Sequence, residues 1–112
     1  MKTYIGIRDL VNDRCTVTVD GQPLDPRLDL RSLSPDGFEW GYWGDAAAQL
    51  ALALLADVAG DEVALAAYEL FKSRVIGGLA AEWRLTDAMI VDWLDRHGRT
   101  PDPSGTLAGS AA

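Results

Sequence analysis

The residues whose side chains could support catalysis are few and isolated. His97 is the only histidine and Cys15 the only cysteine among the 112 residues. A lone histidine needs carboxylate ligands to hold a metal, and no pair of acids lies at ligand spacing around His97. One cysteine excludes an internal disulfide, which suits a reducing compartment. We expect His97 to cap or pack the end of a helix, and Cys15 to be a small buried residue of a strand.

Carboxylate pairs are the other catalytic possibility. Asp61 with Glu62, and Asp92 with Asp95, are close in the chain, but such spacing is typical of helix starts and solvated helix faces. No serine lies in a nucleophile elbow, and no glycine-rich loop is followed by Lys-Ser or Lys-Thr. The sequence therefore favours a non-catalytic protein without cofactor or metal. An enzyme with a carboxylate site stays open as an alternative.

The negative charge of the chain is concentrated in its middle. The net charge is -7, and no Lys or Arg occurs between Ser32 and Phe71. The 10 acids outside this segment equal the 10 bases in number. Such a charge distribution disfavours nucleic acid and anionic membranes as partners and favours a protein with a basic surface. The partner-binding residues predicted on this ground are the seven acids of the segment, Asp36, Glu39, Asp45, Asp57, Asp61, Glu62 and Glu69.

Aromatic side chains gather in the stretch GFEWGYW, residues 37–43. Tryptophans can stack on nucleic-acid bases, but the absence of neighbouring Lys or Arg favours core packing for Trp40 and Trp93. Trp43 breaks the alternation set by Trp40 and Tyr42, so we expect it to point away from their face. An exposed tryptophan is a typical interface anchor. Trp43 is therefore added to the predicted partner-binding residues.

The elements that position these residues begin with strands. Tyr4, Ile5 and Ile7 predict a first strand, and Cys15 to Val19 a second that ends in the turn Asp20-Gly21. A short strand is possible at 28–31. Phe38, Trp40 and Tyr42 alternate with Glu39 and Gly41, which predicts a core strand with the three rings on one face.

Three helices are predicted next, each bounded by capping residues. The first runs from Asp45 as N-cap to about Ala59 and is closed by Gly60; the second runs from Asp61 as N-cap to Gly77-Gly78; the third runs from Thr86 to Gly98. The first helix has no Lys or Arg and many alanines. We expect it to be covered on more than one side and to be central to the fold.

Together these elements predict an α+β fold in which a small antiparallel sheet packs against three helices. The expected organisation is one domain over residues 1–98, followed by a flexible tail over 99–112. The N-terminus lacks the apolar region of a signal peptide, and no apolar run reaches about 18 residues. We therefore expect a cytoplasmic protein that does not enter a membrane.

Several ordered segments resemble a small domain family of unknown function found in bacteria, archaea, phages and plasmids. The resemblance rests on GFEWGY at 37–42, AQLALALL at 48–55, Phe71-Lys72 with the following aliphatic pair Val75 and Ile76, and WRLT with IVDWL between Trp83 and Leu94. The chain departs from the family pattern at Trp43 and at 45–47, where the family tends to have a turn rich in glycine, serine and proline. The resemblance implies no activity, but presence in mobile elements favours an accessory factor such as an inhibitor of host defence.

The functional hypothesis is a small acidic binding protein of the anti-CRISPR kind, encoded by a phage or other mobile element, that occupies a basic nucleic-acid-binding surface of a defence complex. The alternative is a structural or accessory module that self-associates, for example as a homodimer. Its contact surface would use Trp43, Leu52, Leu65 or Ile76.

Overall fold

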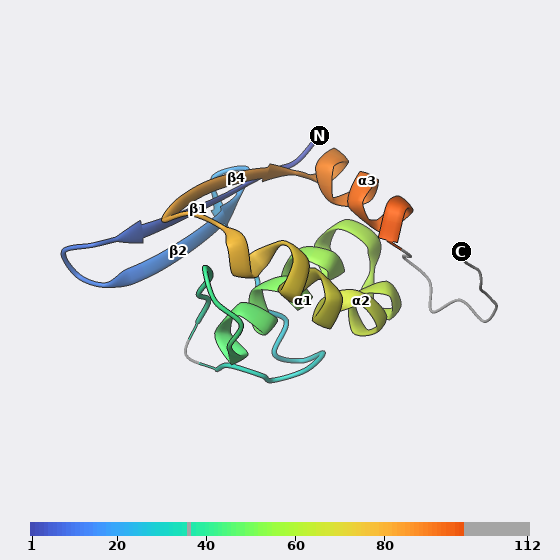
Figure 1. The fold of residues 1–112 in the computed structure, drawn as a ribbon, viewed down its shortest axis with the longest axis horizontal. Helices are drawn as coiled ribbons and strands as arrows, with labels where there is room; N and C mark the ends of the chain where they lie inside the picture. The colour runs from blue at the N-terminus through green and yellow to red at the C-terminus, as the bar shows by residue number, and fades with distance from the viewer. Residues whose placement is uncertain (36, 98–112) are drawn as a thin grey trace.

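The chain folds as a four-stranded sheet packed on helices, described in a computed structural model over residues 1–35 and 37–97 (Figure 1). The elements in chain order are β1 (Thr3–Asp9), β2 (Arg14–Val19), β3 (Gln22–Pro23), α1 (Asp45–Ala59), α2 (Asp61–Arg74), the 3-10 helix η1 (Ile76–Gly78), β4 (Glu82–Thr86) and α3 (Asp87–His97). The strand order is β3-β2-β1-β4, and every neighbouring pair is antiparallel. The predicted α+β class is confirmed. The predicted tail at 99–112 lies outside the described residues.

The two faces of the sheet differ in what covers them. In β1, Tyr4 and Gly6 point toward the helices, and Gly6 pairs with Trp83 of β4. The Trp83 ring occupies the space that a Cβ on Gly6 would need, so this close approach requires glycine. Ile5 and Ile7 point to the opposite face and are 39% and 47% exposed. Figure 1 shows the helices on one side of the sheet only.

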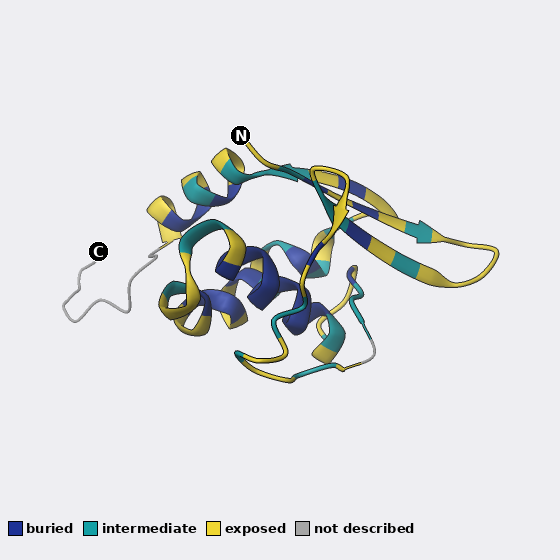
Figure 2. Cartoon of the chain, turned by 180° about the vertical axis from the view of Figure 1, so that it is seen from behind, coloured by how far each residue is buried: buried dark blue, intermediate teal, exposed yellow. Residues whose placement is uncertain are grey.

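Helix α1 is the centre of the core, as its composition predicts. Every residue from Ala47 to Ala56 is buried, and Figure 2 shows most of α1 in the dark blue of buried residues. A helix that is apolar and small on all sides can be covered on all sides, and here α2, α3 and η1 contact it. Tyr4 of β1 also bonds its Asp57, and the connection at 26–34 bonds its Gln49. None of the described helices combines the length and apolarity needed to span a bilayer.

The helix boundaries are close to the prediction, but the caps differ. Gly44 and Gly60 are the N-caps of α1 and α2, without side-chain cap bonds, and Asp45 and Asp61 are the first helical residues. The predicted capping role of these aspartates is wrong. They instead place negative charge in the first turn, where the helix dipole favours it. Helix α2 ends at Arg74, before the predicted glycine pair, and η1 follows.

The start of α3 matches its prediction closely. The helix runs from Asp87, and the backbone N–H of Met89 donates to Thr86 Oγ1 at 3.1 Å. Thr86 therefore acts as the capping residue. Its hydroxyl satisfies one of the amides that the first turn of a helix leaves free.

The predicted core strand at Phe38–Tyr42 is wrong. This segment has no regular secondary structure, and its three rings separate: Trp40 is 1% exposed, Phe38 is half-buried and Tyr42 is 46% exposed. Gly41 has φ +85°, which turns the chain and breaks the alternation of a strand. The possible strand at 28–31 is also wrong, because Leu30 and Arg31 both donate to the Arg27 carbonyl in a turn.

Two strands were not predicted. β3 is only two residues long and gives no periodic signal. β4 does carry one, because Trp83 and Leu85 face inward while Glu82 and Arg84 are exposed. This alternation is short and runs directly into the helical pattern of α3, which hid the strand.

Candidate functional site

The segment at residues 37–44, here called the aromatic loop, is attached firmly to the core. The Trp40 ring meets Trp83 edge to face at 5.5 Å between centroids. The Arg8 guanidinium lies 5.5 Å from the centre of the Trp40 ring and donates to the Trp40 carbonyl at 3.0 Å. Gly41 donates its N–H to the Ile76 carbonyl at 3.1 Å. The loop is therefore held at Trp40 and Gly41, and the residues that follow are presented from a rigid base.

Trp43 is the most exposed tryptophan, at 69%, yet it is fixed in position. Its indole N–H donates to the Ser73 carbonyl at 3.2 Å, near the end of α2. Its ring also fills the space where a Cβ on Gly77 would lie. The prediction that Trp43 points outward is confirmed. The result is a large, mostly exposed apolar side chain that is held by one hydrogen bond and by its contact with Gly77.

Tyr42 lies beside Trp43 in the chain and is also exposed. Its hydroxyl donates to Glu39 Oε1 at 2.8 Å, and its ring occupies the space next to the Gly44 Cα. The hydrogen bond to Glu39 raises the pKa of the Tyr42 phenol, because it holds the proton against a carboxylate. A side chain at Gly44 would overlap the tyrosine ring and displace it.

The predicted acidic residues do not gather into one surface. Three of them are ion-paired with bases: Asp57 with Lys2 at 3.2 Å, Asp61 with Arg27 at 2.9 Å, and Glu69 with Lys72 at 3.0 Å. Asp36 lies outside the described residues. At least three of the seven predicted partner-binding acids are therefore already paired with bases.

Three of the predicted acids form no ion pair with the described residues: Glu39, Asp45 and Glu62. Glu39 and Asp45 flank Trp43 in the chain, and the Glu39 N–H donates to the Ala46 carbonyl at 3.4 Å. Glu62 lies beyond the other end of α1, which is about 22 Å long. The structure thus brings together Glu39, Trp43 and Asp45 at the aromatic loop and leaves Glu62 apart.

A polar hollow of about 280 Å³ adjoins the loop, between residues 12–15 and 37–39. It contains Cys15, whose thiol pKa is raised by burial. A nucleophilic cysteine needs the opposite shift, so this thiol is held in its unreactive form. Asp13, Arg14 and Glu39 line the same hollow and give it mixed charge. Cys15 belongs to β2, as predicted, but is half-buried.

The carboxylate pairs considered for catalysis are occupied in other ways. Asp61 pairs with Arg27, and Asp92 pairs with Arg96 at 2.9 Å. Within residues 1–35 and 37–97, no three His, Cys, Asp or Glu side chains come together in a group that could hold a metal ion. His97 stacks on Trp93 at 4.8 Å between ring centroids, which is the packing role predicted for it.

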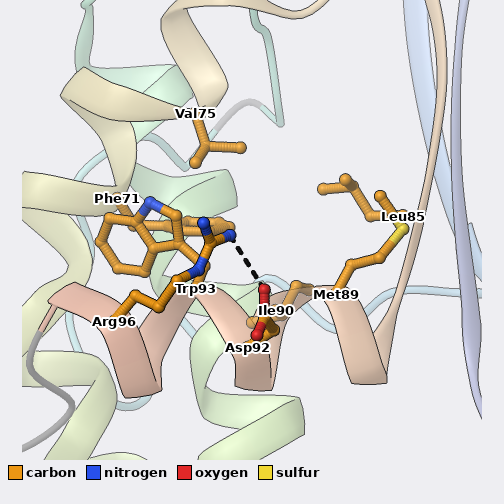
Figure 3. Close-up of a pocket in the computed structure, with 8 residues that line it drawn as sticks. All are labelled: Phe71, Val75, Leu85, Met89, Ile90, Asp92, Trp93 and Arg96. Atoms are coloured by element: carbon orange, nitrogen blue, oxygen red, sulfur yellow. Dashed lines mark ion pairs between the residues drawn. The ribbon is translucent and has the colours of Figure 1, made fainter.

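An open apolar groove of about 240 Å³ lies between α3, the end of α2 and β4 (Figure 3). Met89 is 52% exposed there. Figure 3 shows Leu85 and Met89 together on one side of the groove and Phe71 with Trp93 on the other. The Asp92–Arg96 ion pair lies at its rim. Sequence reasoning missed this groove because it depends on the unpredicted strand β4.

Residues predicted for self-association are only partly accessible. Leu52 and Ile76 are fully buried, so their proposed surface role is wrong. Leu52 faces the interior because α1 is covered on all sides, and Ile76 lies in η1 beneath the aromatic loop. Leu65 is 38% exposed and remains on the surface with Trp43.

Fold and site together define a small α+β domain that presents a fixed aromatic loop from the start of its central helix. The chain belongs to a family of unknown function, DUF6166, whose model matches residues 4–96. The expectation that the chain belongs to a small domain family of unknown function is therefore confirmed. No curated protein and no solved structure matches the chain significantly.

Proposed function

We propose that the protein is a non-catalytic binding protein that recognises a basic surface of a partner protein through its aromatic loop. The observation that carries this function is Trp43, which is largely exposed while both its indole N–H and its ring are fixed. An immobilised aromatic side chain loses little conformational entropy on binding. Tryptophan and tyrosine are also the residues most often found to dominate binding energy at interfaces.

The charge of the partner follows from the residues around Trp43. Glu39 and Asp45 have no ion-pair partner among the described residues, so a basic partner could supply one. Charges at the rim of an interface steer association and are weakened by salt. The finer form of this function is competition with nucleic acid, in which the loop occupies the basic surface of a host defence nuclease complex. The net charge of -7 supports this form, since the chain itself would be repelled by phosphates.

The test begins with capture of partners from an extract of the source cells and repeats the binding with each captured protein in purified form. Trp43→Ala should weaken the complex by about 2 kcal/mol, roughly thirtyfold, because it removes the central apolar contact. Leu65→Ala is the matched control, since it truncates an exposed apolar side chain about two turns of α2 away from Ser73. Calorimetry at about 50 and 500 mM salt should show weaker binding at the higher concentration.

A second pair of variants tests the loop without changing its side chains. Gly77→Ala should displace the Trp43 ring and weaken binding, whereas Gly78→Ala meets no atom within 4 Å and should leave it unchanged. Nucleic acid added to the complex should compete with the chain. Equal affinity of Trp43→Ala and wild type, or binding indifferent to salt, would show that this surface is not the binding site.

A further inference from the structure

Strand β4 forms an open edge of the sheet. On its other side, β4 is hydrogen-bonded to β1. At the two ends of this pairing, Arg8 N–H donates to the Ala81 carbonyl at 3.0 Å and Asp87 N–H donates to the Lys2 carbonyl at 3.1 Å. Hydrogen-bonded pairs alternate with non-bonded pairs along antiparallel strands. Trp83 and Leu85 therefore exchange bonds with β1, while the backbone groups of Glu82 and Arg84 point outward.

These outward groups lack partners within the part of the chain that the structure describes. No backbone or side-chain hydrogen bond there reaches the outward N–H or carbonyl of Glu82 or Arg84, and neither side chain forms an ion pair. The other edge differs, because β3 covers the end of β2 and Leu24 N–H donates to the Val17 carbonyl at 3.1 Å. Unpaired edges of this kind are templates for another strand.

The charges on β4 match a second copy of the same strand. The backbone groups that point outward belong to the even-numbered residues Glu82 and Arg84. Two copies of β4 can form hydrogen bonds only when these groups meet, so even-numbered residues of one copy must lie opposite even-numbered residues of the other. With the two-fold axis at Trp83, Glu82 of each copy faces Arg84 of the other, which gives two opposite-charge pairs. With the axis one residue later, Arg84 faces Arg84, and like charges directly opposite are unfavourable. The charge pattern thus selects one register.

The apolar groove lies on the same side of β4. Leu85 lines it, but no residue of β1 or β2 does, which places the groove away from β1 (Figure 3). In the selected register, Ala81 of the second copy faces Leu85 from the helix side of the sheet. A second copy would therefore extend the sheet and cover the edge of the groove where Leu85 and Met89 are found.

We infer that the chain forms a symmetric dimer through antiparallel pairing of β4 with β4, with the two-fold axis at Trp83 and Glu82–Arg84 pairs between the copies. This interface is formed by β4, whereas the surface proposed to bind a partner protein is the aromatic loop. The interface is isologous and closes on itself, which stops further growth along this edge.

Variants that reverse the charges of Glu82 and Arg84 test this dimer. Their dimer dissociation constants are measured by sedimentation velocity at protein concentrations between about 5 and 500 µM, the range in which weak dimers dissociate. Glu82→Arg should raise the dimer dissociation constant at least about tenfold, because it places a second arginine opposite Arg84 in both pairs. The double variant Glu82→Arg with Arg84→Glu should restore the wild-type constant to within about threefold, since it exchanges the two charges and keeps both pairs. Glu62→Arg is the control, since it changes the net charge equally on an exposed residue without an ion pair among the described residues.

The direction of the effect is informative because Glu82→Arg lowers the net negative charge, which by itself reduces repulsion between copies. A monomer at every concentration, or a dimer weakened equally by the control, would overturn the inference. Failure of the double variant to recover would also do so. Trp43→Ala should leave the dimer intact, and loss of the dimer in that variant would overturn the β4 pairing and move self-association to the aromatic loop.

Discussion

Gln49 is a polar side chain inside the otherwise apolar helix α1, and it is fully buried. Its Oε1 accepts from the N–H groups of Leu33 and Ser34 at 2.7 and 2.9 Å. Its Nε2 donates to the carbonyls of Pro26 and Arg31 at 2.6 and 3.0 Å. The side-chain amide therefore donates two hydrogen bonds and accepts two, which is its full complement. One side chain thus fixes the long connection between β3 and the aromatic loop against the central helix.

Replacing Gln49 by leucine should lower the free energy of unfolding by about 3 kcal/mol. The shape is nearly kept, but four backbone groups of the connection lose their partner. Urea unfolding followed by circular dichroism measures the change, and the exposed Gln22→Leu is the control, for which we expect less than about 0.5 kcal/mol. Gln49→Glu keeps the accepting oxygen but replaces the donating NH2 group by a second oxygen, which would face the carbonyls of Pro26 and Arg31. The free energy of unfolding of this variant should therefore fall at least as far as that of Gln49→Leu when the carboxyl is ionised. If Gln49→Leu lowers the free energy of unfolding by less than about 1 kcal/mol, the connection does not depend on Gln49 for its position.

At the scale of elements, the helices could be predicted because their ends are marked chemically and their interiors are long enough to show periodicity. The aromatic loop could not, because its three rings alternate as in a strand while Gly41 turns the chain. Local alternation does not specify which backbone partners are available, and here the loop bonds to Ile76 and Ala46 instead of a neighbouring strand. β4 had the correct pattern, but only over five residues.

The contact between β1 and α1 makes stability depend on pH at the alkaline end. Tyr4 is fully buried, and its hydroxyl donates to Asp57 Oδ2 at 2.6 Å, an oxygen that also lies 3.2 Å from Lys2 Nζ. Burial, and then the bond to Asp57, raise the pKa of the Tyr4 phenol well above its ordinary value of 10.0. The proton is therefore held more tightly in the folded state than in the unfolded state.

The sign of the pH dependence follows from this difference. Below pH 10 both states keep the phenolic proton, whereas above it only the unfolded state releases it, so the free energy of unfolding should fall as pH rises. Urea titrations between about pH 8 and 11 should show this fall in wild type and a smaller one in Tyr4→Phe. That variant should also be about 1 kcal/mol less stable at about pH 8, because it loses the bond to Asp57. Tyr42→Phe removes an exposed phenol and should keep most of the slope; identical slopes in Tyr4→Phe and wild type would contradict the assignment.

At the scale of the whole molecule, the excess of acids between residues 32 and 71 could be predicted from the sequence. The ion pairs that neutralise some of these acids could not. Lys2 and Arg27 lie 55 and 34 residues from the acids they pair with, and only the folded chain brings them together. The part of the site that could be predicted is the outward position of Trp43. Its fixation by Ser73 and Gly77 could not be, since it depends on how the end of α2 meets the loop.

The burial pattern also predicts how the molecule opens. Amides of α1 between Leu50 and Leu55 should exchange with solvent only through global unfolding, because every neighbouring element covers them. Amides at Leu10 to Asp13, where all side chains are exposed, should exchange by local opening orders of magnitude faster. Native-state hydrogen exchange followed by NMR measures both. Exchange of α1 at a lower free energy than α2 or β1 would show that α1 is not the last element to open.

The exposure of Trp43 has an optical consequence. Trp40, Trp83 and Trp93 are all at most 8% exposed, so a collisional quencher such as acrylamide can reach one indole of four. The accessible fraction of the emission therefore comes from the aromatic loop alone. The native chain carries its own reporter of whether that loop is covered, and no label is needed to follow it.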